Sequence, residues 1–463
     1  MKKGVLLRFA MMVALATAVF PASFSQAGEK TAIKIATLAP KDVGWSITFN
    51  KLINPWFERA TENHFVIKPY WGGVMGNDDD YLRKMKIGQL QGAGLSGQGS
   101  NNACPEFSVL GLPLLFNNYE EVDYIRFVMQ GTFDDFFAQN GYKLLLWIDQ
   151  DFDLFYSSKF RFDKMTDFRM ARIATWYGPQ EAAMLEALGA SPIPSPVTDG
   201  PTLKRTGIVD TNIAPAIFQV GAQLYTIDKY VNTMKIRYSP ATVVFSNEMW
   251  AQIPEKYQNN LMAEQADIQK LFCADIRKDN EKCLKAMVNY GIVEVTPPPD
   301  VMAEIQRRVM KVYNDMSGKL YPVELLKEVR RYLAAYRQKK PQKAEAVALK
   351  EEKSALGEEK AILEEIPRVP EESTETEKEV ETGSAAQEKT NVSSDKASAW
   401  EKRKKEIMEA QKILQGMGFY KAGIDGIAGP ETRNAILEYQ KTKGLPETGS
   451  ISKNLLRQMG IIE

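Results

Sequence analysis

Three glycines near the start of the chain have the spacing of a dinucleotide-binding loop. Gly92, Gly94 and Gly97 match G-x-G-x-x-G, which cradles a pyrophosphate when the glycines follow a strand and open a helix. Here they follow a helical stretch, "DDDYLRKMKIGQL", and precede turn residues and Pro105. We therefore expect no helix after them and no dinucleotide site. Instead, they should let a strand and its loop pass close to other backbone or to a ligand.

The chain offers little for catalysis. It has 1 His, His64, so a zinc site built on several histidines is excluded. A Ser-His-Asp or Cys-His pair would need His64, which lies in a polar segment without a nucleophile signature. Asp78 and Asp79 could in principle act as an acid–base pair. Acidic residues at the start of a helix more often stabilise the helix by interacting with its dipole. We expect no enzyme, no metal and no cofactor.

The cysteines are expected to be free thiols. Cys273 and Cys283 are predicted to share one helix, and ten helical residues separate them by about 15 Å. A disulfide needs Cα atoms within roughly 7 Å. Cys104 completes the 3 Cys of the chain.

Arg172 is the best candidate for binding an anion. "RMARIATWYGPQEAAMLEALGA" predicts a strand over 169–174, a turn, and a helix from Gly178 and Pro179 to Gly189. Arg172 would then lie near the carboxyl end of its strand, where open α/β sheets bind ligands, and close to a helix N-terminus. A guanidinium binds a carboxylate through two hydrogen bonds. The alternative is a surface arginine paired with a nearby acid.

Composition and length indicate an exported protein of several units. The 463 residues predict two or three folding units, and 59 basic against 59 acidic residues give no field that favours nucleic acid. Lys2 and Lys3 precede an apolar run over residues 4–20, and small residues end at Ala27. This predicts a signal peptide over 1–27 and a periplasmic location. A retained anchor is the alternative, although the run is short for a membrane span.

The elements around these residues follow an α/β order. A strand over 32–40, a helix over 45–63 and a strand over 64–72 predict a parallel β-α-β unit. Three regions differ in composition: an alternating α/β region over 28–340, a charged low-complexity linker over 341–399, and a region with renewed hydrophobic periodicity over 400–463.

The first region resembles the DctP-type solute-binding proteins of TRAP (tripartite ATP-independent periplasmic) transporters. The matching stretches are "IKIATLAP", "YWGGVMGNDDDYLRKMKIGQLQGAGLSG", "PEFSVLGLPLLF", "ARIATWYGPQEAAMLEALGASPIP" and "GIVDTNIAP". The resemblance implies a two-lobed periplasmic-binding-protein-like α/β fold that encloses a small organic acid between its lobes and presents it to a TRAP-type membrane permease. In the family an arginine at the position of Arg172 commonly pairs with the ligand carboxylate.

The resemblance has departures at the ligand pocket. The family motif "VDGQENP" is replaced by "VDTNIAP" over 209–215, so that its Asn becomes Ala214 and Asn212 is the expected substitute. A second basic residue of the family is replaced by Asp153, and a ligand-packing aromatic residue by Val197. The usual carboxylate pocket is therefore only partly kept. A ligand with an amine, or a larger and more apolar one, stays open. Four aromatic side chains could form apolar walls, although each also fits a core: Trp45, Phe152, Trp176 and Tyr177.

The last region resembles the peptidoglycan-binding module called PG_binding_1. It has "G-x-x-D-G-x-x-G-P-x-T" over 423–432, followed by "A-I-x-x-[FY]-Q". A small all-α, three-helix domain is implied, with Tyr420, Asp425 and Thr432 as candidate peptidoglycan-binding residues. "DGIAGPET" lacks the alternating acidic ligands of an EF-hand.

These observations predict a wall-tethered solute-binding protein. The expected partners are a small-molecule ligand that carries a carboxylate, TRAP-type permease subunits, and peptidoglycan. The candidate ligand contacts are Arg172, Asn212, Trp176, Asp153 and Trp45. The alternatives are a wall-tethered scaffold or sensory protein with a repurposed pocket, and a wall hydrolase, which the lone histidine disfavours.

Overall fold

A computed structural model describes residues 30–338 and 392–462, apart from 427, 446 and 450. The predicted signal peptide over 1–27 and most of the predicted linker lie outside the described residues.

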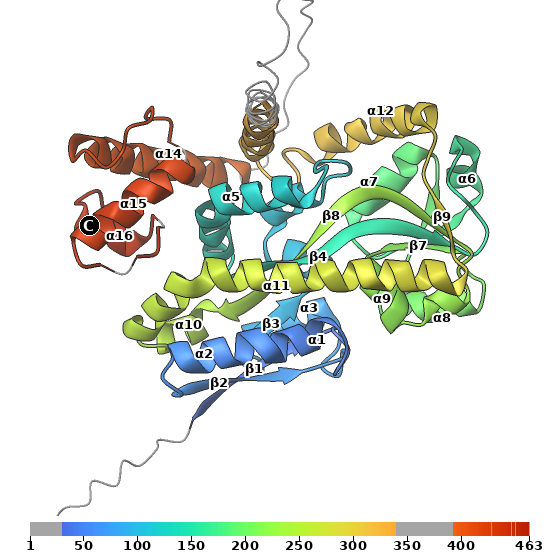
Figure 1. Cartoon of the computed structure of the whole chain (residues 1–463), viewed down its shortest axis with the longest axis horizontal. Helices are drawn as coiled ribbons and strands as arrows, with labels where there is room; N and C mark the ends of the chain where they lie inside the picture. The colour runs from blue at the N-terminus through green and yellow to red at the C-terminus, as the bar shows by residue number, and fades with distance from the viewer. Residues whose placement is uncertain (1–29, 339–391, 427, 446, 450, 463) are drawn as a thin grey trace, which may run out of the picture.

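One mixed sheet runs through the first region (Figure 1). Its order is β2-β1-β3-β8-β4-β7-β5-β6, with β9 paired to β8. The short parallel strands form two groups, β2-β1-β3 in the first lobe and β7-β5-β6 in the second lobe. The long antiparallel strands β4 and β8 join the two groups and belong to both lobes. The strands are β1 Thr31–Thr37, β2 Phe65–Tyr70, β3 Gly92–Leu95, β4 Tyr142–Ser157, β5 Arg172–Thr175, β6 Ser191–Pro194, β7 Thr211–Ala214, β8 Tyr230–Ser246 and β9 Val293–Val295.

Helices cover both faces of this sheet, and the longest, α11, extends along both lobes (Figure 1). Its residues Ile268, Phe272 and Ile276 pack in the core of the first lobe, whereas Met287 packs in that of the second. The helices are α1 Trp45–Thr48, η1 Phe49–Ile53, α2 Asn54–Ala60, α3 Asp78–Lys86, α4 Gly97–Ala103, η2 Pro105–Gly111, α5 Tyr119–Gln139, α6 Met165–Met170, α7 Pro179–Leu188, α8 Gly200–Arg205, α9 Ala216–Gly221, η3 Leu224–Thr226, α10 Asn247–Gln252, α11 Glu255–Tyr290, α12 Pro299–Met316, and a helix over 323–338.

The expected α/β fold class and the β-α-β start are confirmed, since β1 and β2 pair in parallel around α1, η1 and α2. The predicted end of α7 is confirmed too, because Gly189 caps it at φ 91° in the left-handed region. Two expectations are wrong. Residues 165–170 form a helix, so the predicted strand over 169–174 begins only at Arg172. A helix, α4, does follow the glycines, because the Ser96 side chain caps it by accepting a hydrogen bond from Gly99 N (3.1 Å).

The C-terminal region is the expected small three-helix domain. Its helices are α14 Val392–Gly416, α15 Pro430–Thr442 and α16 Lys453–Gln458, and α14 begins inside the predicted linker. A separate apolar cluster includes Leu414, Ile436 and Leu456, all buried. This core gives the domain its own packing.

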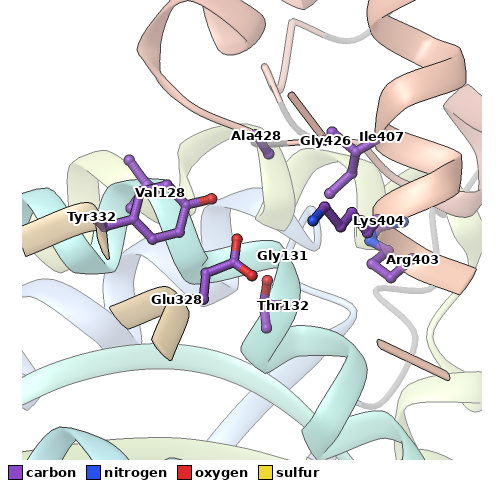
Figure 2. A pocket seen from close by; sticks show the side chains of 10 residues that line it. All are labelled: Val128, Gly131, Thr132, Glu328, Tyr332, Arg403, Lys404, Ile407, Gly426 and Ala428. Atoms are coloured by element: carbon purple, nitrogen blue, oxygen red, sulfur yellow. The ribbon is translucent and has the colours of Figure 1, made fainter. Parts of the chain in front are cut away.

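The C-terminal domain lies against α5 (Figure 1). Arg403 Nε lies 2.9 Å from Asp135 Oδ2, and the Arg433 guanidinium lies 4.9 Å from the ring centroid of Phe127. Figure 2 shows side chains from α5, the helix over 323–338 and α14 around a cavity of about 20 Å³. That volume holds about one water molecule, so this cavity is a packing gap between the two domains and not a ligand site.

Candidate functional site

A largely apolar cavity of the described chain lies where four parallel strands end. It has a volume of about 260 Å³. The segments that follow β1, β3, β5 and β7 all contribute to its walls, and the middles of β4 and β8 contribute Gln150 and Ala241. Ligands bind open α/β sheets at the carboxyl ends of the strands. The cavity therefore occupies the cleft between the two lobes, at the point where the shared strands cross.

Trp45 and Trp176, two of the predicted ligand contacts, line this cavity from opposite lobes. Trp45 follows β1 and packs against the rings of Phe49 and Phe272 at centroid distances of 5.4 and 5.1 Å. Trp176 follows β5 and donates from Nε1 to the Ile213 carbonyl (3.2 Å). These contacts hold each indole in one orientation.

The backbone that carries Trp176 is held by a buried carboxylate. Glu181 Oε2 accepts hydrogen bonds from Thr175 Oγ1 (3.0 Å), Trp176 N (3.1 Å) and Tyr177 N (2.7 Å). Three donors on one oxygen fix the turn between β5 and α7 and with it the wall of the cavity.

Few polar side chains lie at the floor of the cavity, and Gln150 is one of them. Gln150 lies at a shift in the β4–β8 register between Asp149 and Asp151, and its Oε1 accepts from Gly97 N (2.8 Å) and Ser239 Oγ (3.2 Å). The amide NH₂ of Gln150 is left for the cavity.

Ser96 also lines the cavity, and its hydroxyl donates to the buried Asp78 carboxylate behind it. Burial raises the pKa of Asp78 to about 6. The floor therefore carries hydroxyl and amide groups on its surface and an acid directly beneath them.

Arg172 lies elsewhere. It is the first residue of β5 and not near its carboxyl end, so the predicted position is wrong, because α6 takes up the residues before it. Its side chain is 46% exposed and its Nε lies 3.3 Å from Asp210 Oδ2. Arg172 is outside the cavity lining. The arrangement corresponds to the alternative considered from sequence, a surface arginine paired with an acid.

Asp153 and Asn212 are engaged in buried polar clusters and are outside the cavity lining. Asp153 Oδ2 accepts from Arg237 Nε (2.7 Å), and burial, offset in part by Arg237, raises the pKa of Asp153 to about 6. The amide of Asn212 bonds to Gln219 (2.8 Å) and accepts from Lys204. Their predicted ligand contacts therefore stay without geometric support in this arrangement.

Arg237 is a residue that sequence reasoning missed. It is buried in β8, pairs with both Asp153 and Glu181, and lies 3.8 Å from the ring centroid of Tyr177. An arginine within the apolar run "MKIRYSPATVVF" was the available signal, since a buried charge needs a partner.

The glycines serve close packing, as expected. A Cβ on Gly92 would lie 2.5 Å from the Val244 carbonyl oxygen, and one on Gly97 would lie 2.1 Å from Tyr177 Oη. Gly94 lines the cavity beneath Trp45.

The remaining candidates for chemistry have structural contacts. His64 Nδ1 lies 2.9 Å from Tyr257 Oη, and Cys273 and Cys283 share α11 as free thiols, as expected. In the described residues, no group of His, Cys, Asp and Glu is arranged to hold a metal ion. None of the helices within these ranges has the length and apolar character needed to cross a bilayer.

The candidate residues of the C-terminal domain share one hydrogen-bond network, in which Tyr420 and Thr432 are buried and Asp425 is exposed. Gln411, fully buried, donates to Tyr420 Oη (3.1 Å), Asp425 Oδ1 (2.8 Å) and Thr432 Oγ1 (3.0 Å). It also accepts from the Gly426 N–H (2.9 Å). Tyr420 and Thr432 are almost fully buried. The motif residues therefore fix the glycine-rich turn between α14 and α15.

The comparisons with known proteins agree with this geometry. Residues 37–319 match the family described as bacterial extracellular solute-binding protein, family 7. The chain belongs to this family. Residues 403–459 match the putative peptidoglycan binding domain. Both resemblances drawn from the sequence are confirmed, and the two matches indicate an extracytoplasmic protein. Proteins of this family bind small ligands and work with membrane permease subunits, and the relatives described next are binding proteins.

Three similar proteins illustrate the solute-binding family. The 2,3-diketo-L-gulonate-binding periplasmic protein YiaO of Escherichia coli is 21% identical over 53% of this chain and 75% of its own length. The sugar acid binding protein of Advenella mimigardefordensis, solved with galactonate, has a TM-score of 0.62 at 18% identity and covers 66% of this chain and 99% of its own. A TRAP solute-binding protein of Haemophilus influenzae, solved with L-gulonate, has a TM-score of 0.59 at 18% identity, covering 65% and 100%.

Proposed function

We propose that this protein captures a small organic ligand in the cleft cavity, passes it to a TRAP-type permease, and is held to peptidoglycan by its C-terminal domain. The observation that carries the proposal is the cavity of about 260 Å³ at the carboxyl ends of β1, β3, β5 and β7, between lobes joined by β4 and β8. Two lobes that share long strands can close on a ligand by bending at the crossing.

The carboxylate predicted for the ligand rests on the family. Galactonate, L-gulonate and succinate are the ligands of three solved relatives. In this chain Arg172 pairs with Asp210 (3.3 Å) outside the cavity, so a carboxylate clamp would need Arg172 to leave that pair and turn. Whether Arg172 binds the ligand is therefore the first point to test.

The test is native mass spectrometry of the purified protein, followed by identification of the bound molecule after denaturation. The full chain, Arg172→Ala and Trp176→Ala are compared. Capture in the cavity predicts a bound small molecule that Trp176→Ala reduces. If Arg172→Ala also removes it, the family clamp operates here. A full chain that stays empty after soaking in metabolite mixtures would instead favour the wall-tethered scaffold.

Tethering is tested by cosedimentation with purified peptidoglycan sacculi. The full chain should sediment with the sacculi, whereas a variant without residues 392–463 should stay in the supernatant. Equal sedimentation of both would contradict the tether, and release of muropeptides by the full chain would revive the hydrolase alternative.

A further inference from the structure

We infer that the cleft cavity selects an uncharged ligand with a largely hydrocarbon body, about the size of two fused rings. The inference rests on the proposed solute capture and names the class of solute.

The lining of the cavity is the first ground. Every lining residue in the described part of the chain is uncharged, and most are apolar. The side-chain polar groups are those of Thr37, Ser96, Gln150 and Thr198 beside the two tryptophans. A charged ligand would lose its hydration here without gaining an ion-pair partner, which carries a large free-energy cost.

The second ground is that three basic side chains of the sheet and its helices already have acidic partners. The family position that often holds a basic residue is Asp153 here. The cation beside it, Arg237, comes from β8 and is shared between Asp153 (2.7 Å) and Glu181 (3.2 Å). Two carboxylates on one guanidinium leave no net positive charge to attract a ligand anion.

The second lobe repeats this arrangement with a lysine. Lys204 is 1% exposed and forms an ion pair with the buried Asp228, and the same ammonium donates to Asn212. Arg172, at the opposite end of β5, pairs with Asp210. Arg237, Lys204 and Arg172 are therefore each paired with at least one carboxylate.

The acid beneath the floor is the third ground. Asp78 lies behind Ser96, which donates its hydroxyl to that carboxylate. The nearest formal charge on that side is thus negative, and its field opposes an anionic ligand in a cavity of low dielectric constant. A cation makes no direct ion pair with Asp78, because the Ser96 hydroxyl already donates to that carboxylate, so the cost of desolvating the cation is not offset.

Size narrows the class further. An apolar cavity of about 150 Å³ holds benzene, so the cavity of about 260 Å³ accepts a body of roughly two fused rings. The free amide NH₂ of Gln150 offers one donor, which suits a neutral acceptor such as an amide or ketone oxygen.

The experiment uses three probes with one ring system and different charges. Indole-3-acetamide is neutral, indole-3-acetate is an anion and tryptamine is a cation. Binding of each to the full chain is measured by isothermal titration calorimetry at pH 7.5, with Arg172→Ala and Trp176→Ala as matched variants and succinate as a dicarboxylate control.

The inference predicts that indole-3-acetamide binds at least tenfold more tightly than either charged probe. Arg172→Ala should leave this order unchanged, and Trp176→Ala should weaken the amide at least fivefold. Tightest binding of indole-3-acetate, tryptamine or succinate would overturn the ligand class while leaving solute capture intact. Failure of all four to bind folded protein would overturn the class as well. Solute capture itself would then be judged by the copurified ligand, so the two failures are distinguishable.

Discussion

Arg237 offers the sharpest test of how the second lobe is held together. Its side chain is 2% exposed, with Asp153 and Glu181 both fully buried against it. At an effective dielectric constant of about 20, pairs at 2.7 and 3.2 Å are worth roughly 6 and 5 kcal/mol before desolvation. Removing one partner of a buried pair typically costs about 3–5 kcal/mol. Arg237→Met, which keeps the length of the side chain, should therefore lower the free energy of unfolding by that amount at pH 8.

The loss should depend on pH in a defined direction. Burial raises the pKa of Asp153 to about 6, and Arg237 counters part of that rise. An acid whose pKa is raised in the folded state contributes stability that is lost as pH rises through that pKa. Without Arg237 the pKa rises further, so the variant keeps Asp153 neutral to higher pH. The difference between wild type and variant should grow from about pH 6 upward, by about 1.4 kcal/mol for each unit of extra pKa.

Urea unfolding followed by circular dichroism at pH 5.5 and pH 8 measures both effects. The control is Arg237→Met combined with Asp153→Leu, which removes one stranded acid. Glu181 tolerates the loss because Thr175 Oγ1 and two backbone N–H groups still donate to it, so the double variant should recover about half of the loss or more. A single variant that costs less than about 1 kcal/mol at pH 8, or a double variant no better than the single one, would refute the reasoning.

Three further predictions concern packing. Gln411→Ala should destabilise the C-terminal domain by about 2–3 kcal/mol, because it strands several buried polar groups; the midpoint of that domain's thermal transition measures it, and an unchanged midpoint would contradict the network. Arg403→Ala removes the ion pair to Asp135 (2.9 Å) and should increase the radius of gyration in small-angle X-ray scattering; an identical profile would mean that this pair does not hold the domains together. Gly97→Ala should lower the melting temperature by several degrees, since its Cβ would lie 2.1 Å from Tyr177 Oη, whereas a neutral result would require that the tyrosine move freely.

Local sequence signals predicted the elements well where one segment contains all the information. The helix from Pro179 to the Gly189 cap follows from residues within a dozen positions. Of the four aromatic side chains predicted as possible walls, Trp45 and Trp176 line the cavity, whereas Phe152 and Tyr177 are buried outside its lining. The helix after the glycines was missed, although the capping serine, Ser96, was present.

The charges could not be placed from a single sequence. Arg172 meets an acid 38 residues away, and Asp153 meets Arg237 across 84 residues. Such pairs depend on which strands become neighbours, and neither periodicity nor capping determines that. The family resemblance predicted that Arg172 would contact the ligand carboxylate. Because β5 begins at Arg172, this side chain lies at the opposite end of the strand and outside the cavity lining.

The buried charges of the second lobe also shape the cavity that they do not line. Arg237 pairs with Glu181 through one carboxylate oxygen, while the other oxygen holds the backbone of Trp176 and Tyr177. The Glu181 carboxylate therefore has two roles: it pairs with the Arg237 guanidinium, and it fixes the backbone of Trp176. The three hydrogen bonds to Glu181 Oε2 hold the turn that forms the cavity wall, and Oε1 of the same carboxylate faces Arg237. The carboxylate that holds the backbone of Trp176 thus also pairs with Arg237, and a cation shared by two buried carboxylates favours an uncharged ligand over an anion.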